Sequence, residues 1–331
     1  MNIKNIEYIK APLAKIDFSD ERNRITLGDA GGFLKKSIRE LGIINPPLVA
    51  ENGAGGFRII CGFRRVMCAR AESGHEPGSG VPDVLITCAL ARGFSEADEI
   101  AASVEDNAAS RRLGPVEISS AIAGLSKYFD KKFIIEKYFD SFGIQKSEFA
   151  FARYLEIASL SDAARDAVAS GKLPMQAASF LVEFSRKRQE DFMRLASDCR
   201  MGANLLTEMA KNIFEISRQR RVAIDSIFET IGLENVISDD KLNSNEKSGL
   251  LRERVLDLKF PEYRSRLGAF QESVKKLGCA GVISVNPFPY FEKDEINVSF
   301  TIKNASEVKK RIGDIRKFEN SDLIKEFVGN D

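Results

Sequence analysis

The chain has 331 residues, of which 44% are hydrophobic and 29% are charged, a composition typical of a soluble globular protein. This length exceeds one ordinary core and indicates two or three domains. The 49 basic and 48 acidic residues leave a net charge of +1, so nucleic-acid binding could come only from local clusters of charge. The single histidine, His75 in a glycine-rich loop, excludes metal sites with several histidines and argues against a Ser-His-Asp triad.

Cysteine usage and hydropathy favour a cytoplasmic protein. The five cysteines are an odd number and show no CxxC spacing, which argues against a disulfide framework. No apolar run approaches the roughly 20 residues that span a bilayer, and residues 1–20 lack the apolar stretch of a signal peptide. We therefore expect a reducing compartment and no membrane contact.

Helix and strand signals alternate through the first third of the chain. In chain order they predict a helix at 33–41 that stops at Gly42, a β-hairpin at 46–62, a helix at 63–73, a strand at 83–90 and a helix at 95–109 with Ser95 as its N-cap. This alternation indicates an α/β domain at the N-terminus.

From Pro115 the pattern changes to successive amphipathic helices. They are predicted at 115–129, 131–143, 146–160, 161–171 and 173–198, which indicates an all-α domain. Residues 205–275 continue as helix, interrupted by the polar stretch 238–249. Two strands around a proline-rich connection at 281–302, and a helix at 305–318, predict a small α+β module at the end of the chain.

Residues 131–160 have the form of a helix-turn-helix. The first helix ends at Gly143, whose missing Cβ suits a left-handed turn. Ile144 is expected to enter the core, and the second helix is expected to bury Phe149 and Leu155. The alternative is an ordinary α-hairpin within a helical bundle.

If the second helix enters the major groove, its N-terminal exposed residues would meet the bases. The candidates for DNA contact are Lys146, Ser147, which is also the expected N-cap, Glu148, Arg153 and Tyr154. Arg153 could bind guanine or phosphate, whereas Lys146 is better suited to phosphate.

A second candidate site is the arginine pair Arg64 and Arg65, which follows Gly62 at a strand-to-helix junction. Forked guanidinium donors and the free amides of a helix N-terminus both bind phosphate oxygens. The pair therefore predicts a phosphate-binding turn, although surface arginine pairs are common and do not identify a ligand.

The surrounding motifs carry a family resemblance. The chain contains, in this order, SIRELGIINPPLV, GFRRVMCA and EDNAASRRLGPVEISSAI, followed by the helix-turn-helix and then the helix start SGKL. Over about residues 5–185 this series resembles ParB-family partition proteins, whose N-terminal domain shares its fold with sulfiredoxin. The resemblance implies a multidomain α+β protein with a ParB/sulfiredoxin-like α/β domain at 1–114, an all-α helix-turn-helix domain at 115–235 and an α+β C-terminal module at 236–331.

Members of that family bind DNA, and many bind CTP with Mg²⁺ and close as a clamp on DNA. The resemblance therefore implies a cytoplasmic, nucleoid- or plasmid-associated protein that binds double-stranded DNA and could bind CTP and Mg²⁺. Carried over to this chain, the nucleotide site would comprise Pro46, Gly62, Arg64, Arg65, Asp106, Asn107 and Arg111, with Asn107 near the metal.

The chain departs from the family motifs at five positions. Met67 stands where the family has an arginine, and Asp106 stands where it has a glutamate. Phe63 stands where the family has an acid, Ser110 stands where it has an arginine, and Arg111 stands where it has a second acid. Hydrolysis of a triphosphate needs a carboxylate to hold the metal or orient water. We therefore expect a weak CTPase at most, and we assign no catalytic residue.

The resemblance also bears on partners. The first 14 residues contain lysines but no arginine, which leaves a ParA-type ATPase partner open. The alternating segment DEINVSFTIK could pair with a second copy and make a homodimer. Partition of a plasmid or chromosome and regulation of transcription both remain open.

The alternative to a DNA-binding protein is an enzyme on the same N-terminal fold. A sulfiredoxin-type activity would need a reactive cysteine at the position of Phe63, and Cys61 is expected to be buried on the preceding strand. A nuclease or a phosphotransferase would need clustered acids or histidines, whereas this region offers mainly arginines.

Overall fold

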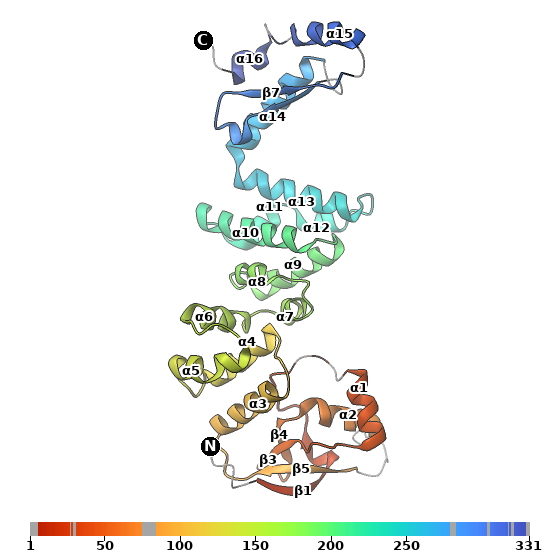
Figure 1. The fold of residues 1–331 in the computed structure, drawn as a ribbon, viewed down its shortest axis with the longest axis vertical. Helices are drawn as coiled ribbons and strands as arrows, with labels where there is room; N and C mark the ends of the chain where they lie inside the picture. Colours follow the sequence, from red (N-terminus) through yellow and green to blue (C-terminus); the bar gives the residue numbers. More distant parts are fainter. Residues whose placement is uncertain are drawn as a thin grey trace. The chain divides into compact units, whose positions relative to one another are not determined.

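The fold is taken from a computed structural model that describes residues 6–26, 28, 31–74, 84–278, 283–302, 305–316, 318 and 321–328. His75 and Cys279 lie outside the described residues. The chain divides into two compact units, Met1–Ser197 with Gly202–Thr207 and Asp198–Met201 with Glu208–Asp331. Both units mix helices and strands, as the sequence predicts (Figure 1).

A five-stranded mixed sheet lies in the first unit, with the strand order β1-β5-β3-β4-β2. Its strands are β1 (Ile6–Pro12), β2 (Ile16–Asp17), β3 (Leu48–Glu51), β4 (Phe57–Cys61) and β5 (Leu85–Ala91). The antiparallel pair β3–β4 confirms the predicted hairpin. The edge strand β1 pairs with β5 in antiparallel direction, and a short 3-10 turn, Leu13–Lys15, leads from β1 to β2.

Helices cover both faces of this sheet. On one face, α1 (Gly32–Leu41) and α2 (Phe63–Ser73) pack with Val49 and Ile59 into one core cluster. On the other face, Leu48 and Ile60 pack with Ala102 of α3 (Glu96–Ser110). The inside-outside alternation of β3 and β4 therefore separates two layers, as the two-residue period of a strand requires.

The helix boundaries in this domain follow the predicted signals. The stop of α1 at Gly42 is confirmed, because this glycine has a φ of 72° and its amide donates to the carbonyl of Ile38. The N-cap of α3 is also confirmed, because Ser95 and Asp98 form a reciprocal capping box.

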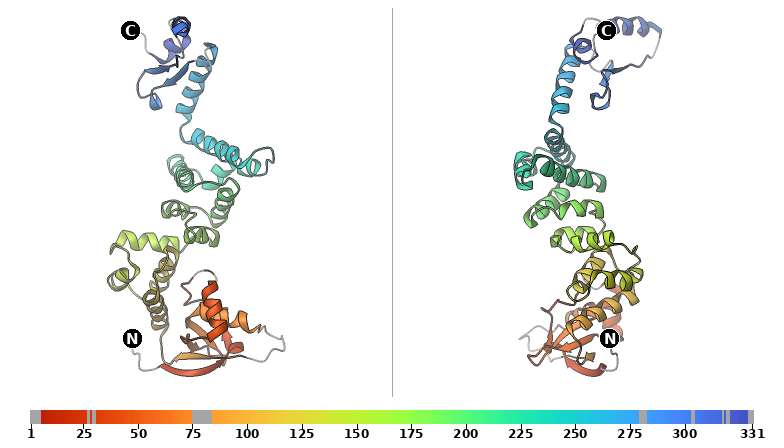
Figure 2. Two further views of the ribbon diagram at one scale, coloured as in Figure 1. Left: turned by 45° about the vertical axis from the view of Figure 1, so that its right-hand side comes forward. Right: turned by 90° about the vertical axis from the view of Figure 1, so that its left-hand side faces the viewer.

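Helices make up the rest of the first unit. They are α4 (Pro115–Leu125), α5 (Lys131–Phe142), α6 (Glu148–Ile157), α7 (Asp162–Ala169), α8 (Met175–Leu181) and α9 (Arg186–Asp198). One hydrophobic cluster joins Ile100 and Val104 of α3 to residues of α4, α5 and α6. Helix α3 therefore contacts the sheet and also α4 and α5 (Figure 2).

The boundary between the units falls within α10 (Ala203–Arg220). The second unit continues with α11 (Ile224–Thr230), α12 (Leu233–Ile237), α13 (Ser244–Lys259) and α14 (Pro261–Lys276). Helix α13 begins inside the polar stretch that was predicted to interrupt the helices, because Asn243 and Glu246 form a capping box there.

The C-terminal part of the second unit is the predicted α+β module. It contains the antiparallel strands β6 (Ser284–Pro287) and β7 (Ile296–Ser299), a 3-10 turn at Pro289–Phe291, α15 (Ala305–Arg316) and α16 (Asp322–Phe327). Phe270 of α14 and Phe327 of α16 stack edge to face in its core. Among the described residues, no helix combines the length and the apolar character that crossing a bilayer requires.

Candidate phosphate pocket and nucleic-acid interface

The first residues of α2 form one wall of a cavity in the first unit. The cavity has a volume of about 300 Å³, and we name it the α2 pocket. Its walls are formed by the segment after β2, by α1, by the turn before β3, by the start of α2 and by α3. The residues that line it are Ile25, Thr26, Leu34, Asn45, Gly62, Phe63, Arg64, Arg65, Ser103, Asp106, Asn107, Ser110 and Arg111. Of the predicted nucleotide site, only Pro46 is absent from this lining.

Gly62 is the N-cap of α2, and no other residue fits there. Its φ is 90°, and a Cβ would lie 2.9 Å from the Cβ of Pro47 and 3.0 Å from Nη2 of Arg65. A glycine N-cap offers no side-chain oxygen to the first helical amides, and no side-chain cap hydrogen bond is formed. The amides of Arg65 and Val66 donate to the carbonyl of Gly62, which leaves those of Phe63 and Arg64 available to an anion.

Arg65 braces the mouth of the α2 pocket. Its Nη1 donates to the carbonyl of Asn45 at 2.6 Å and to that of Pro46 at 3.4 Å. Its Nη2 forms an ion pair with Asp106 of α3 at 3.3 Å. Most of the hydrogen-bonding capacity of Arg65 thus holds the turn before β3 against α3.

Two buried polar atoms in the α2 pocket have no hydrogen-bond partner among the described residues. They are Nε of Arg64 and Oγ1 of Thr26. Thr26 is only 8% exposed, so water does not satisfy its hydroxyl freely. Buried donors without partners are costly, and both residues that carry them line the cavity.

The wall formed by α3 is already internally bonded. The Asn107 amide donates to the carbonyl of Ser103 at 2.8 Å, and its Oδ1 accepts from Nη2 of Arg111 at 3.5 Å. Arg111 makes two hydrogen bonds of 2.7 Å with Glu117, which also accepts from the Gly114 amide at the start of α4. Glu117 therefore offsets much of the charge of Arg111.

Cys61 lies directly before the pocket and is buried, as predicted. Burial, and then the negative charge of Asp106, raises the pKa of its thiol to about 12. A thiol in this state supplies almost no thiolate at neutral pH. The rejection of a sulfiredoxin-type chemistry at this turn therefore has a physical basis.

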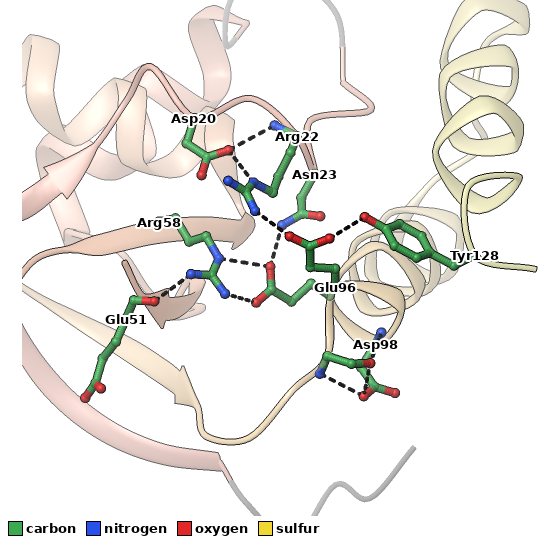
Figure 3. A network of polar contacts seen from close by, with 10 residues as sticks. Asp20, Arg22, Asn23, Glu51, Arg58, Glu96, Asp98 and Tyr128 are labelled. Atoms are coloured by element: carbon green, nitrogen blue, oxygen red, sulfur yellow. Dashed lines mark hydrogen bonds and ion pairs between the residues drawn. The ribbon is translucent and has the colours of Figure 1, made fainter. Parts of the chain in front are cut away.

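Sequence reasoning missed a buried ionic network that holds α3 against the sheet (Figure 3). Glu99 of α3 is fully buried and accepts from Nε of Arg58 at 3.0 Å, from Nη2 of Arg58, and from the Asn23 amide at 3.1 Å. Arg58 also donates to the carbonyl of Glu51 at 2.6 Å. At its rim, Glu96 binds both Arg22 and the Tyr128 hydroxyl.

This network positions the α2 pocket, because Asn23 precedes the lining residues Ile25 and Thr26. The Ser103 hydroxyl of α3 also donates to the carbonyl of Asn23 at 2.7 Å. No local motif could have found these partners, because Arg58 and Glu99 are 41 positions apart in the sequence.

The second candidate site is the helix-turn-helix formed by α5 and α6. Helix α5 ends at Gly143, which adopts a φ of 68°, and Ser147 caps α6 by accepting from the Ala150 amide at 3.1 Å. Ile144 packs against the helical core, and Phe139, four residues before the turn glycine, is fully buried. The turn, its cap and its core contact are therefore confirmed.

The predicted orientation of α6 was wrong. Phe149 is 75% exposed and Leu155 is 38% exposed, whereas Phe151 and Ile157 are buried. Because residues three, four and seven positions apart share a helix face, the buried face is the one that carries Phe151, Tyr154 and Ile157. The outward face carries the exposed residues Phe149, Ala152 and Leu155, together with the exposed acids Glu148 and Glu156.

The charged candidates on the helix-turn-helix differ in how far they are engaged. Lys146 forms an ion pair with Asp140 at 2.8 Å, which raises its pKa, and Glu148 pairs with Lys131 at 2.7 Å. Arg153 is partly buried, and its Nε has no partner among the described residues. Of the two predicted cationic DNA contacts, Lys146 is held in an ion pair, whereas Nε of Arg153 has no partner among the described residues.

Tyr154 and Ser147 have structural roles. Tyr154 packs against the helical core, and burial raises its pKa. Its backbone carbonyl accepts from the Ser119 hydroxyl of α4 at 2.5 Å. The hydroxyl of Ser147 is occupied by the helix cap. Contact of either residue with DNA stays a prediction.

Comparison with known proteins gives matches among solved structures only. No protein-family model matches the chain, and none of the curated proteins matches it. One similar structure is the C-terminally truncated chromosome-partitioning protein ParB from Caulobacter crescentus complexed to the centromeric parS site, with a TM-score of 0.31, 15% identity, and coverage of 61% of this chain and 98% of that one. Another is the same truncated protein complexed with CTP-gamma-S, with a TM-score of 0.26, 20% identity, and coverage of 56% and 99%. Identities and TM-scores this low assign no ligand and no DNA site to this chain.

Proposed function

We propose that the chain is a ParB-like, sequence-specific DNA-binding protein whose N-terminal domain responds to a nucleotide of the CTP type. The observation that carries this proposal is the sharing of α3 between two sites. One side of α3 lines the α2 pocket through Ser103, Asp106, Asn107 and Arg111. An adjoining strip of the same helix, formed by Ile100 and Val104, packs in the core of the helix-turn-helix.

The nucleotide site in this proposal is the α2 pocket. Gly62 and the start of α2 supply backbone amides, Arg64 supplies an uncommitted guanidinium, and Arg65 shapes the entrance. Pro46 flanks the entrance through its carbonyl. Asp106, Asn107 and Arg111 form the α3 wall.

The DNA site in this proposal is the outward face of α6, inserted into the major groove. Arg153 would bind guanine or phosphate, while Lys146 and Glu148 would approach DNA only by exchanging their ion pairs with Asp140 and Lys131. Ser147 and Tyr154 would contribute at the start and the edge of the same helix.

The proposal further assigns three functional domains, at 1–114, 115–235 and 236–331, and a homodimer formed through the last of them. The nucleotide would change how two copies of the chain enclose DNA, either in partition or in regulation of transcription. A catalytic alternative has less support, because Asp106 is the one carboxylate among the described residues that line the α2 pocket, and it pairs with Arg65.

The test is to incubate the protein with fragmented genomic DNA, with and without CTP, and to sequence the retained fragments. We expect enrichment of a discrete sequence and a change in retention when CTP is present. Retention that is independent of sequence, or unchanged by CTP, would contradict the corresponding half of the proposal.

Two single-residue variants separate the sites. Arg153→Ala should weaken binding to the enriched sequence by about 1–3 kcal/mol and relax the preference at one position. Arg64→Ala should remove the effect of CTP and leave the affinity for the enriched DNA intact. Equal loss of both activities in both variants would indicate misfolding, which circular dichroism would detect.

A further inference from the structure

The oxygen ligands of the α2 pocket are poorly suited to a divalent cation. Mg²⁺ prefers carboxylate oxygens that are free to complete an octahedral shell. Asp106 is paired with Arg65. Glu117, beside the pocket, accepts hydrogen bonds from Nη1 and Nη2 of Arg111. The Asn107 amide oxygen faces Arg111 and its nitrogen is bonded to the carbonyl of Ser103. Among the described residues, no group of three or more acids, cysteines or histidines could hold a metal.

The same pocket is well suited to an anion. Its lining contains three arginines and one acid, and of these arginines Arg65 is paired with Asp106 and Arg111 with Glu117. Among the described residues, Nε of Arg64 and Oγ1 of Thr26 are buried donors without partners. The N-terminus of α2, which has no side-chain cap, adds backbone amides. The residues that carry these donors come from two separate segments, the one after β2 and the start of α2, and line one cavity, so the anion site does not depend on the helix terminus alone.

We propose that the α2 pocket binds the phosphate end of a nucleotide without a divalent cation. Guanidinium groups and amides there supply the positive charge that a bound metal would otherwise supply. This inference rests on the proposed function, because it concerns the nucleotide site of that function. In this inference the pocket binds the free phosphate chain and not its complex with a metal ion.

The experiment is calorimetry of the full chain with two probes, CTP and inorganic tripolyphosphate, each in excess EDTA and in excess Mg²⁺. We expect both probes to bind in EDTA, and tripolyphosphate to compete with CTP. Added Mg²⁺ should leave the dissociation constant of CTP unchanged or raise it, because complexation reduces the negative charge of the phosphate chain.

Variants test whether the named donors bind the phosphate. Arg64→Ala and Thr26→Val should each weaken CTP in EDTA by about tenfold or more, equivalent to about 1.4 kcal/mol. Thr26→Ser retains the hydroxyl and should bind CTP like the wild type, which separates the hydrogen bond from a folding defect. Arg112→Ala, an exposed neighbour outside the pocket lining, is the matched control and should leave the affinity unchanged.

The outcomes distinguish the inference from the proposed function. Binding of CTP that EDTA abolishes and Mg²⁺ restores would overturn the metal-free site and leave the nucleotide response standing. Wild-type affinity in both Arg64→Ala and Thr26→Val would overturn the assigned donors. If neither probe binds in either condition, the nucleotide half of the proposed function fails together with the inference.

Discussion

Phe149 and Phe151 lie two positions apart on α6, yet Phe149 faces solvent and Phe151 lies in the core. An aromatic ring at the start of a helix that enters the major groove can contact the methyl group of thymine. We therefore expect Phe149→Ala to weaken binding to the preferred DNA by about 1–3 kcal/mol and to relax the preference at one base pair. The measurement is the affinity for that site and for single-base variants of it.

Stability provides the matched control for this prediction. Because Phe149 is largely exposed, its removal should change the free energy of unfolding by less than about 0.5 kcal/mol. Phe151→Ala should lower the free energy of unfolding by about 3–5 kcal/mol, because it leaves a cavity in the core. Undiminished DNA specificity in Phe149→Ala would mean that this face of α6 does not read the bases.

The orientation of α6 could not be obtained from its sequence. Phe149, Ala152 and Leu155 form one apolar row, and Phe151, Tyr154 and Ile157 form another on the opposite face. Both rows satisfy the helical period, so the pattern does not determine which row is buried. Contacts with α4 and the helical core, made by residues distant in sequence, decide the orientation.

The buried thiol of Cys61 makes the free energy of unfolding fall as the pH rises into the alkaline range. Its folded-state pKa is about 12, raised from an ordinary value of 9.0. The stabilisation is fully present below that ordinary value and is lost as the pH rises toward the folded-state pKa, because the unfolded state releases its proton first. Between pH ~8.5 and pH ~10 we expect Cys61 to account for a loss of roughly 1 kcal/mol in the free energy of unfolding.

Urea unfolding at pH 7.5 and pH 10 measures this effect. The decrease should be smaller in Cys61→Ala than in the wild type. A residual decrease is expected, because burial also raises the pKa of Cys88, to about 11. Identical pH dependence in the wild type and in Cys61→Ala would contradict the assignment.

At the scale of elements, the position of α3 depends on the ion pair between Arg58 and Glu99. The pair raises the pKa of Arg58, chiefly through its hydrogen bonds to Glu99. Removing one partner leaves a buried charge uncompensated, so Glu99→Ala should lower the free energy of unfolding by about 3–5 kcal/mol. Denaturant unfolding checks this value.

An exposed ion pair in the same domain is the matched comparison. Glu7 and Arg92 are 2.9 Å apart, and both side chains are largely exposed. Glu7→Ala should cost less than about 1 kcal/mol, because solvent screens the pair. Similar losses in Glu7→Ala and Glu99→Ala would show that burial does not control the strength of the Arg58–Glu99 pair.

The sequence predicts the elements of this fold better than it predicts their contacts. The hairpin β3–β4, the stop at Gly42, the cap at Ser95 and the turn at Gly143 follow from local chemistry. Strand β1 was missed, because its place is set by pairing with β5, almost 80 positions away. Thr26 belongs to no motif, and the segment that carries it is held against α3 by the bonds of Asn23 to Glu99 and Ser103.

At the scale of the whole molecule, the C-terminal module leaves apolar side chains exposed. On α15 they are Val308, Ile312 and Ile315, whose spacing of four and three residues places them on one helix face. Phe300 and Ile302, which follow β7, are exposed as well. A second copy of the chain that covered these residues would bury them, which supports the proposed homodimer.

We expect sedimentation at micromolar concentration to show a dimer of the wild-type chain. Ile312→Glu should shift this equilibrium toward monomer, because it places a charge in the apolar face. Lys325→Gln on α16 also lowers the charge by one unit, and it should leave the dimer intact. A monomeric wild-type chain would contradict the proposed dimer.

Helix α3 belongs to two cores at once, one against the sheet and one against α4 and α5. A recombination event that exchanged only the helix-turn-helix would separate residues that pack in one core. Apolar side chains would then be exposed on both parts. We therefore expect the α2 pocket and the helix-turn-helix to be exchanged between proteins only together. Heating should likewise melt the α2 pocket and the helix-turn-helix in a single calorimetric transition, with no intermediate in which one of the two stays intact.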